Sequence, residues 1–143
     1  MIDLVTVILF FLVVASLIDF YTKQVPSVFL TGLIVIVAVV NLAEIQFGMI
    51  HLTFGVISFV FAYMLYEADF IGGVADIKVI TIIGMLCSTI PFLLTFFGLV
   101  GLLGLLYKGF WLFALKKKEN DLVPFLPCLL WIFITLWFVG GLI

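Results

Sequence analysis

The stretch FLLTFFGLVGLLGLLYKGFWLFAL, residues 92–115, decides the class of fold, because its only charged residue is Lys108. A helix needs about 20 mostly apolar residues to cross a bilayer. The rest of the chain has the same character. Of its 143 residues, 67% are hydrophobic and 10% are charged, whereas about 25% are charged in an ordinary soluble domain. We therefore expect an integral membrane protein.

Five other segments are similarly apolar, and short polar connections separate them. They cover residues 2–18, 26–43, 49–66 and 76–89, with a last segment that follows Pro124. We expect an all-α integral membrane protein, a bundle of six transmembrane helices that forms a single domain over residues 1–143. The fourth segment is short, since residues 77–90 would cover only about 21 Å of a hydrocarbon core of about 30 Å. Alternatively, Pro91 could kink one long element, which would leave five spans.

Lysines mark every second connection between these segments. Lys23 lies in the first connection, Lys78 borders the third, and residues 116–118 are a run of lysines in the fifth. Basic connections stay on the cytoplasmic side of a membrane. The odd-numbered connections are therefore predicted to be cytoplasmic and both termini to lie outside, in a multi-pass protein of the cell membrane. The lysine run is expected to bind anionic lipid headgroups.

Two carboxylates stand at the boundaries of the apolar segments. Asp19 follows the first segment and Asp76 begins the fourth. Two crossings lie between them, so both are predicted at the cytoplasmic boundary. Carboxylates that cluster in apolar surroundings are usually functional, and two of them brought close in a low dielectric share one proton. Such a pair can activate water and protonate a leaving amine, although two solvated loop carboxylates would have the same spacing.

Three stretches around these acids carry a resemblance to a known family. DFYTKQVP, residues 19–26, resembles the first catalytic motif of type IV prepilin peptidases. GGVADIK, residues 72–78, resembles their second motif, usually written GxGD. VPFLP, residues 123–127, is similar to the IPFGPF element that opens their last helix. The motif residues besides the two acids are Lys23, Pro26, Gly72, Gly73, Ala75, Lys78, Pro124 and Pro127.

The resemblance to the prepilin and preflagellin peptidases implies an aspartyl endopeptidase without a cofactor. Asp19 and Asp76 would be its catalytic pair, and an activated water would attack the substrate. The implied substrate is a type IV pilin-like, pseudopilin or archaellin precursor, whose short basic leader is removed at the cytoplasmic face. Ala75 replaces the second glycine of GxGD, a departure that is closer to the archaeal preflagellin branch. The cysteine-rich loop of the bifunctional members is absent, so we expect cleavage without methylation.

The remaining polar residues receive supporting roles. Gly72 and Gly73 are expected to let the third connection turn tightly and bring Asp76 toward Asp19. Glu67 and Asp69 give this face a negative field that would attract a basic leader. Lys23 would share a helix face with Asp19 if the first helix continues that far.

Other kinds of site lack the residues that they need. Cys87 and Cys128 are isolated thiols, so no metal site is expected. The net charge of −2 and the absence of a basic patch argue against nucleic acid. His51, the only histidine, is predicted on the outer side, away from both acids. Two alternatives stay open: an inactive family member that binds pilin-like helices, and a small transporter with a cation site at the two aspartates.

Overall fold

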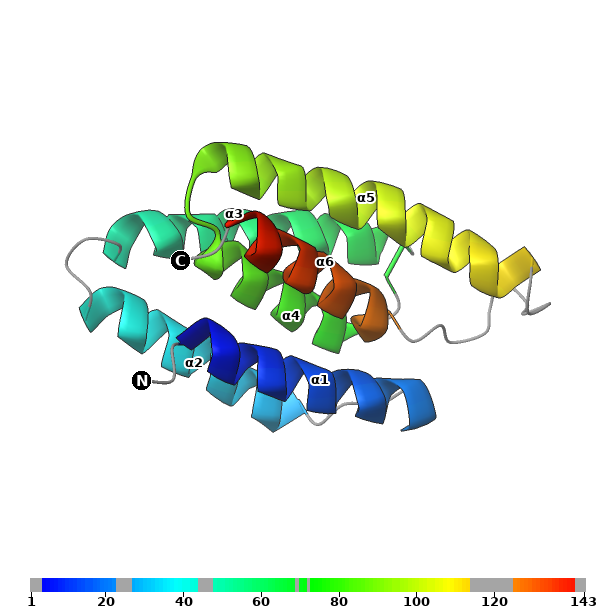
Figure 1. Cartoon of the computed structure of the whole chain (residues 1–143), viewed down its shortest axis with the longest axis horizontal. Coiled ribbons are helices and arrows are strands. Elements are labelled where there is room, and N and C mark those ends of the chain that lie inside the picture. The colour runs from blue at the N-terminus through cyan, green and yellow to red at the C-terminus, as the bar shows by residue number, and fades with distance from the viewer. Residues whose placement is uncertain are drawn as a thin grey trace.

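The computed structural model describes residues 4–22, 27–43, 48–68, 70–71, 73–113 and 125–140, and their regular structure is entirely α-helical. Figure 1 shows the arrangement of these helices. They are α1 (Leu4–Thr22), α2 (Ser27–Ala43), α3 (Gly48–Glu67), α4 (Val74–Leu86), α5 (Ile90–Phe113) and α6 (Leu126–Val139). The prediction of an all-α chain is therefore confirmed for the described residues.

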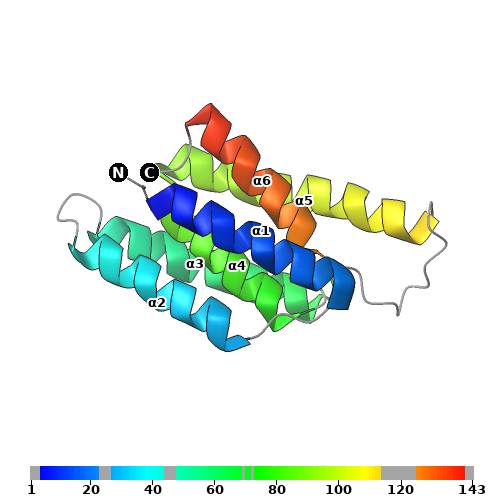
Figure 2. The ribbon, with the colours of Figure 1, turned by 60° about the horizontal axis from the view of Figure 1, so that its bottom comes forward.

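Successive helices run in opposite directions along the long axis of the molecule (Figures 1 and 2). The end of α1, the start of α4 and the start of α6 consequently lie at one end of the bundle. Helix α4 packs against α3, α2 and α6, while α1 and α5 each pack against α6. The short fourth helix is therefore the centre around which the others gather.

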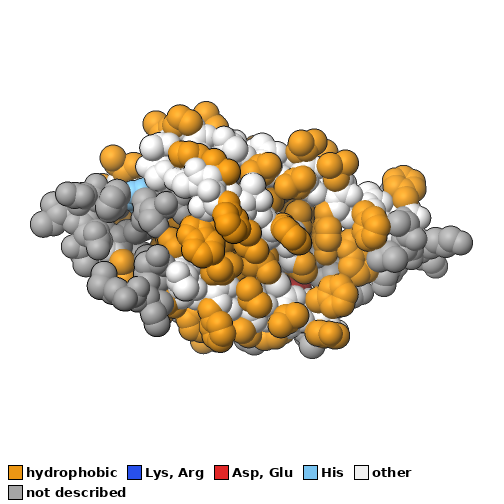
Figure 3. Space-filling view, in the orientation of Figure 1, with side chains coloured by type: hydrophobic (Ala, Val, Ile, Leu, Met, Phe, Trp, Pro, Cys, Tyr) orange, Lys and Arg blue, Asp and Glu red, His pale blue; other side chains and the backbone are white. Residues whose placement is uncertain are grey.

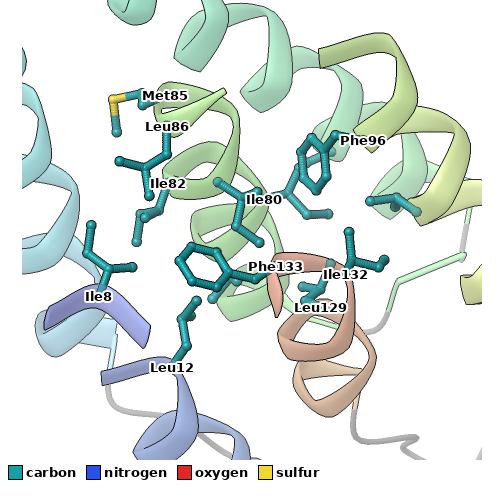
Figure 4. Packing of buried hydrophobic residues seen from close by; sticks show 14 of the residues in the cluster. Ile8, Leu12, Ile80, Ile82, Met85, Leu86, Phe96, Leu129, Ile132 and Phe133 are labelled. Carbon is teal, nitrogen blue, oxygen red and sulfur yellow. The ribbon is translucent and has the colours of Figure 1, made fainter. Parts of the chain in front are cut away.

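Helix α4 can be short because its neighbours cover it. It has 13 residues, which corresponds to about 20 Å of helix. From Asp76 to Leu86 every residue except Lys78 is buried. Figure 4 shows the core that its apolar side chains form with the other helices. The labelled members are Ile8 and Leu12 of α1, Ile80, Ile82, Met85 and Leu86 of α4, Phe96 of α5, and Leu129, Ile132 and Phe133 of α6.

Two glycines allow α3 and α4 to lie unusually close together. A Cβ atom added to Gly84 of α4 would overlap the Ser58 hydroxyl of α3 and would lie 3.3 Å from the Phe54 carbonyl oxygen. On the other side of the contact, a Cβ atom on Gly55 would overlap the Met85 side chain. In a membrane there is no hydrophobic driving force for helices to associate, so helix contacts depend on close packing. Small residues allow that packing because they let the helix backbones approach closely.

The structure corrects two predicted helix boundaries. Helix α1 continues to Thr22, and α4 already begins at Val74. Asp19 is therefore a helical residue, where the sequence predicted that the first helix ends before it, and Asp76 lies inside the first turn of α4 instead of starting it. Pro91 does not kink one long element, because Cys87 has an extended conformation with ψ 132° and separates α4 from α5. Pro91 lies in the first turn of α5, where its missing N–H leaves no hydrogen bond unmade.

The surface of the described residues is largely apolar. Two helical stretches, Met49–Glu67 and Ile90–Trp111, are long and apolar enough to cross a membrane, and only 28% and 22% of them is buried inside the molecule. Helices that serve as the core of a soluble protein would be mostly buried. On the face seen in Figure 3 most described side chains are hydrophobic, and Phe113 and Phe138 are 86% and 83% exposed. Apolar surface of this extent is typical of contact with lipid, while crossing by all six helices stays a prediction.

Candidate active site

The two aspartates lie at the same end of the bundle, although they come from α1 and α4. Asp19 belongs to the last turns of α1 and Asp76 to the first turn of α4. Both side chains are buried, at 8% and 6% exposure respectively. Carboxylates are rarely buried unless another group interacts with them, so the surroundings of each one indicate what the site can do.

Asp19 is held by the start of the last helix. The backbone N–H of Leu126 donates a hydrogen bond of 3.1 Å to the Asp19 carboxylate. The first N–H groups of a helix have no partner within the helix, and they carry the positive end of its dipole. Pro127, the motif residue that follows, has no N–H of its own. Asp19 thus stabilises the N-terminus of α6, and α6 in turn stabilises a negative charge on Asp19.

Asp76 lies close to a helix N-terminus as well, here that of its own helix. Its backbone N–H donates to the Gly73 carbonyl oxygen over 3.2 Å. One oxygen of its carboxylate lies 4.0 Å from the position that a Cβ atom on Gly73 would take. The side chain therefore folds back over the first turn of α4, where the helix dipole favours an anion.

Gly73 contributes space to this turn. Its φ of −155° and ψ of 158° are extended values, which any residue can adopt. The expected role of this glycine in a tight turn therefore does not come from its conformational freedom. Because the hydrogen atom of Gly73 leaves room beside the Asp76 carboxylate, a side chain here would cover one of its oxygens.

Both carboxylates lie within electrostatic range of the Tyr107 hydroxyl of α5. Asp19 accepts from Leu126, and Asp76 acts electrostatically on the thiol of Cys128 in the same helical turn. The hydroxyl of Tyr107 experiences the charge of Asp19 and that of Asp76 together. Two residues remote in the chain thus lie at one end of the bundle, both within electrostatic range of Tyr107.

A row of aromatic rings lies across this end of the bundle. Phe20 contacts Trp111 with ring centres 6.3 Å apart, Trp111 contacts Tyr107 at 6.3 Å, Tyr107 contacts Phe125 at 6.4 Å, and Phe125 contacts Phe70 at 6.2 Å. We refer to these five residues as the aromatic arc. Every contact is edge-on, the geometry that aromatic pairs favour. The arc connects α1 and α5 with the segments that precede α4 and α6.

Sequence reasoning missed the aromatic arc. One signal was present, because Phe20 directly follows Asp19 and Phe125 directly precedes Leu126. The space for the arc comes from Gly104, where an added Cβ atom would lie 2.9 Å from the Phe70 ring and 3.0 Å from the Phe125 ring. Aromatic residues are frequent throughout this chain, so the few that gather at the acids could not be distinguished by composition.

The other described motif residues support the helices around the acids. Lys78 donates a hydrogen bond of 2.7 Å to the Thr31 hydroxyl and so links α4 to α2. Ala75 is partly buried and packs against the core. Pro127 is partly buried in the first turn of α6. These residues position the two helix N-termini that carry or contact the acids.

Glu67 is exposed at the end of α3, which lies at the same end of the bundle as the aspartates. Its carboxylate accepts a hydrogen bond from the Tyr63 hydroxyl. Five further predicted residues lie outside the described residues, as does the lysine run of residues 116–118. The five are Lys23, Pro26, Asp69, Gly72 and Pro124.

The opposite end of the bundle holds the histidine. His51 is buried in the first turn of α3, and its ring hydrogen-bonds the backbone of Met85 and Cys87 at the end of α4. It is remote from both acids, as the sequence predicted. Within the described ranges there is no group of three or more His, Cys, Asp or Glu side chains that could hold a metal ion.

Comparison with known proteins identifies the family. The sequence matches the model of the type IV leader peptidase family over residues 6–109. The chain belongs to this family. The resemblance inferred from the three motifs is thereby confirmed. No curated protein and no solved structure matches the chain.

Membership of the type IV leader peptidase family makes the chain a peptidase with a protein substrate. The matched region contains Asp19, Asp76 and Tyr107. It ends before Leu126, so the hydrogen bond that α6 donates to Asp19 is a feature of this structure that the family match does not reach.

Proposed function

We propose that this type IV leader peptidase is an aspartyl endopeptidase with Asp19 and Asp76 as its catalytic pair. The observation that carries the proposal is that two buried carboxylates, from α1 and α4, lie at the same end of the bundle, and that the start of α6 holds one of them. Each carboxylate lies at a helix N-terminus, which lowers the cost of a negative charge in apolar surroundings. The proposed substrate is a type IV pilin-like, pseudopilin or archaellin precursor, from which the enzyme removes a short basic leader.

The proposed mechanism uses one proton shared by the two acids. The ionised carboxylate accepts a proton from a water molecule as the water oxygen attacks the scissile carbonyl carbon. The protonated carboxyl donates its proton to the carbonyl oxygen, which gives a neutral tetrahedral intermediate. One acid then donates a proton to the leaving nitrogen while the other carboxylate accepts a proton from a hydroxyl group of the intermediate. The C–N bond breaks, a carboxylic acid forms, and the pair holds a single proton again.

The proposed orientation places the pair at the cytoplasmic face of the membrane, with all six helices crossing and both termini outside. The alternating directions of the helices and the exposed apolar surface support this topology. Glu67 is exposed at the same end of the bundle as the acids. Its negative charge would attract a basic leader before the leader reaches the carboxylates.

The experiment that tests this function compares cleavage by the wild type with cleavage by Asp19→Asn and Asp76→Asn. Each purified protein is incubated in detergent with a precursor that carries a class III signal peptide. We expect both variants to lose activity by a factor of at least about 1,000, since each removes an acid–base group. Glu44→Gln is the matched control, because the sequence predicts this carboxylate on the opposite face.

Three results would count against the proposal. Full cleavage by either aspartate variant would remove that residue from the mechanism. A wild-type protein that binds the precursor without cutting it would be an inactive relative that holds pilin-like helices. Stabilisation of the wild type by a cation, lost in both variants, would favour a transporter with a cation site.

A further inference from the structure

Ser16 of α1 carries a buried hydroxyl group that makes no hydrogen bond. The residue is 6% exposed, and its side-chain oxygen meets no donor or acceptor within the described part of the chain. Buried polar groups nearly always have a partner, because an unpaired one costs free energy. A buried serine without one therefore requires a reason in packing or in function.

The usual partner of a helical hydroxyl is not used here. A serine or threonine inside a helix can donate to the carbonyl oxygen four residues earlier. Four threonines of this chain do so over 2.8 to 2.9 Å, namely Thr53, Thr81, Thr95 and Thr135. Ser16 does not donate to the Leu12 carbonyl oxygen in this way, so its proton is available to another acceptor.

An acceptor follows one helical turn later on the same buried face of α1. Figure 4 shows Ile8 and Leu12 of this face pointing into the core, and Asp19 continues it at 8% exposure. Residues three positions apart in a helix are neighbours on its surface. Helical side chains also lean toward the helix N-terminus, which for Asp19 is the turn that contains Ser16. Rotation about the single serine side-chain torsion can therefore bring the hydroxyl to the carboxylate.

The Asp19 carboxylate has capacity for a second donor. Its Oδ2 atom accepts a hydrogen bond of 3.1 Å from the Leu126 N–H at the start of α6. An ionised carboxylate has two oxygens with about four acceptor positions. A second donor would fix the plane of the carboxylate as well as its position, and it would favour the ionised form.

We propose that Ser16 is a positioning residue of Asp19, and that its hydroxyl donates a hydrogen bond to the carboxylate when Asp19 carries the charge of the pair. An ionised carboxylate is a stronger acceptor than a protonated one, so the bond forms in the charged state. Ser16 and the Leu126 N–H then hold the carboxylate from α1 and from α6. This inference rests on the proposed function and adds to it a side chain that lies one turn deeper in the bundle.

The test is the pH profile of kcat/KM for the wild type and Ser16→Ala. Alanine removes the oxygen and keeps the rest of the side chain. Without this donor the charged form of Asp19 is less stable, so the pair keeps its second proton to a higher pH. We expect the acid limb to move upward by about one pH unit and kcat at the optimum to fall about tenfold. The other titratable side chains around the acids, Asp76, Tyr107 and Cys128, are the same in both proteins.

Stability gives a second readout, which separates positioning from a structural role. Ser16→Ala removes a buried hydroxyl that has no bond in the structure, so its unfolding temperature in detergent should equal or exceed that of the wild type. A residue that merely supports the fold would show the reverse, with lower stability and an unchanged pH profile.

Ser58→Ala is the matched control. Ser58 of α3 is also buried, and its hydroxyl likewise has no partner among the described residues. It lies at the close contact with Gly84, in the middle of α3 and away from the acids. The same chemical change there should leave the pH profile superimposed on that of the wild type.

The outcomes separate this inference from the function on which it rests. If the wild type cleaves and the Ser16→Ala profile superimposes on the wild-type profile, the positioning role is refuted while the aspartate mechanism stands. An equal shift in Ser58→Ala would also refute it, because the shift would then not be specific to Asp19. A Ser16→Ala protein that fails to fold would refute it as well, since the hydroxyl would then be structural. A wild type that does not cleave would overturn both.

Discussion

The contact between Gly84 and Ser58 gives the sharpest prediction for the fold. Gly84→Ala adds a Cβ atom that overlaps the Ser58 hydroxyl and lies 2.5 Å from the Ser58 Cβ atom and 3.3 Å from the Phe54 oxygen. Carbon atoms in contact are about 3.5 to 4.0 Å apart. Helices α3 and α4 must therefore separate by about 1 Å, because the Ser58 hydroxyl and the Phe54 backbone offer no room.

The expected magnitude follows from a comparison with Gly98→Ala on α5, where an added Cβ atom meets nothing within 4 Å. Both variants gain about 1 kcal/mol of helix propensity, so this gain cancels between them. The steric cost at Gly84 remains, and overpacking of this kind costs about 1 to 3 kcal/mol. We expect Gly84→Ala to be less stable than Gly98→Ala by about 2 kcal/mol.

The assay is unfolding in mixed micelles, with the free energy of unfolding taken from a titration with SDS. A second substitution, Ser58→Gly, removes the atoms that the new methyl group meets, so the double variant should recover most of the loss. Cleavage should follow stability, because Asp76 lies on the same helix about 12 Å away. Equal stability of the two alanine variants, or no recovery in the double variant, would refute the close contact.

Three further predictions concern the surroundings of the acids. A double-mutant cycle with Lys78→Met and Thr31→Val should give a coupling of about 1.5 kcal/mol in the same unfolding titration, and no coupling would mean that the link between α4 and α2 is absent. Gly104→Ala should reduce kcat by more than its loss in free energy of unfolding explains, because the added methyl group displaces two rings of the aromatic arc. Gly101→Ala is the control, since a Cβ atom added there meets nothing within 4 Å. Asp19→Asn should keep the free energy of unfolding, because the amide oxygen still accepts the hydrogen bond from the Leu126 N–H. Asp19→Leu should lose about 1 to 3 kcal/mol, because it leaves that buried N–H unpaired. Equal free energies of unfolding for the two variants would contradict the hydrogen bond.

The number and order of the helices could be predicted from the sequence, because long apolar segments and the polar residues between them follow directly from composition. The positions of Asp19 and Asp76 at one end of the bundle followed from parity alone. Helix ends were less accurate. The residues after Ile18 include no proline or glycine before Pro26, so nothing local prevents α1 from extending past the aspartate.

The contacts around the acids could not be predicted, because they depend on packing between distant helices. The residues of the hydrogen bond from Leu126 to Asp19 are 107 positions apart. Likewise, the role of Gly84 depends on Ser58 of another helix. No local pattern distinguishes Tyr107 from the other aromatic residues until α5 is placed beside α6.

The hydrogen bond between the first and last helices has a consequence for biosynthesis. A chain is synthesised from its N-terminus onward, so α1 and α4 are made before α6. Until then Asp19 lacks its backbone donor and α6 cannot close the bundle around the acids. In the proposed mechanism the peptidase therefore becomes active only after α6 has been made, and a ribosome-bound or truncated chain without α6 does not cleave other proteins.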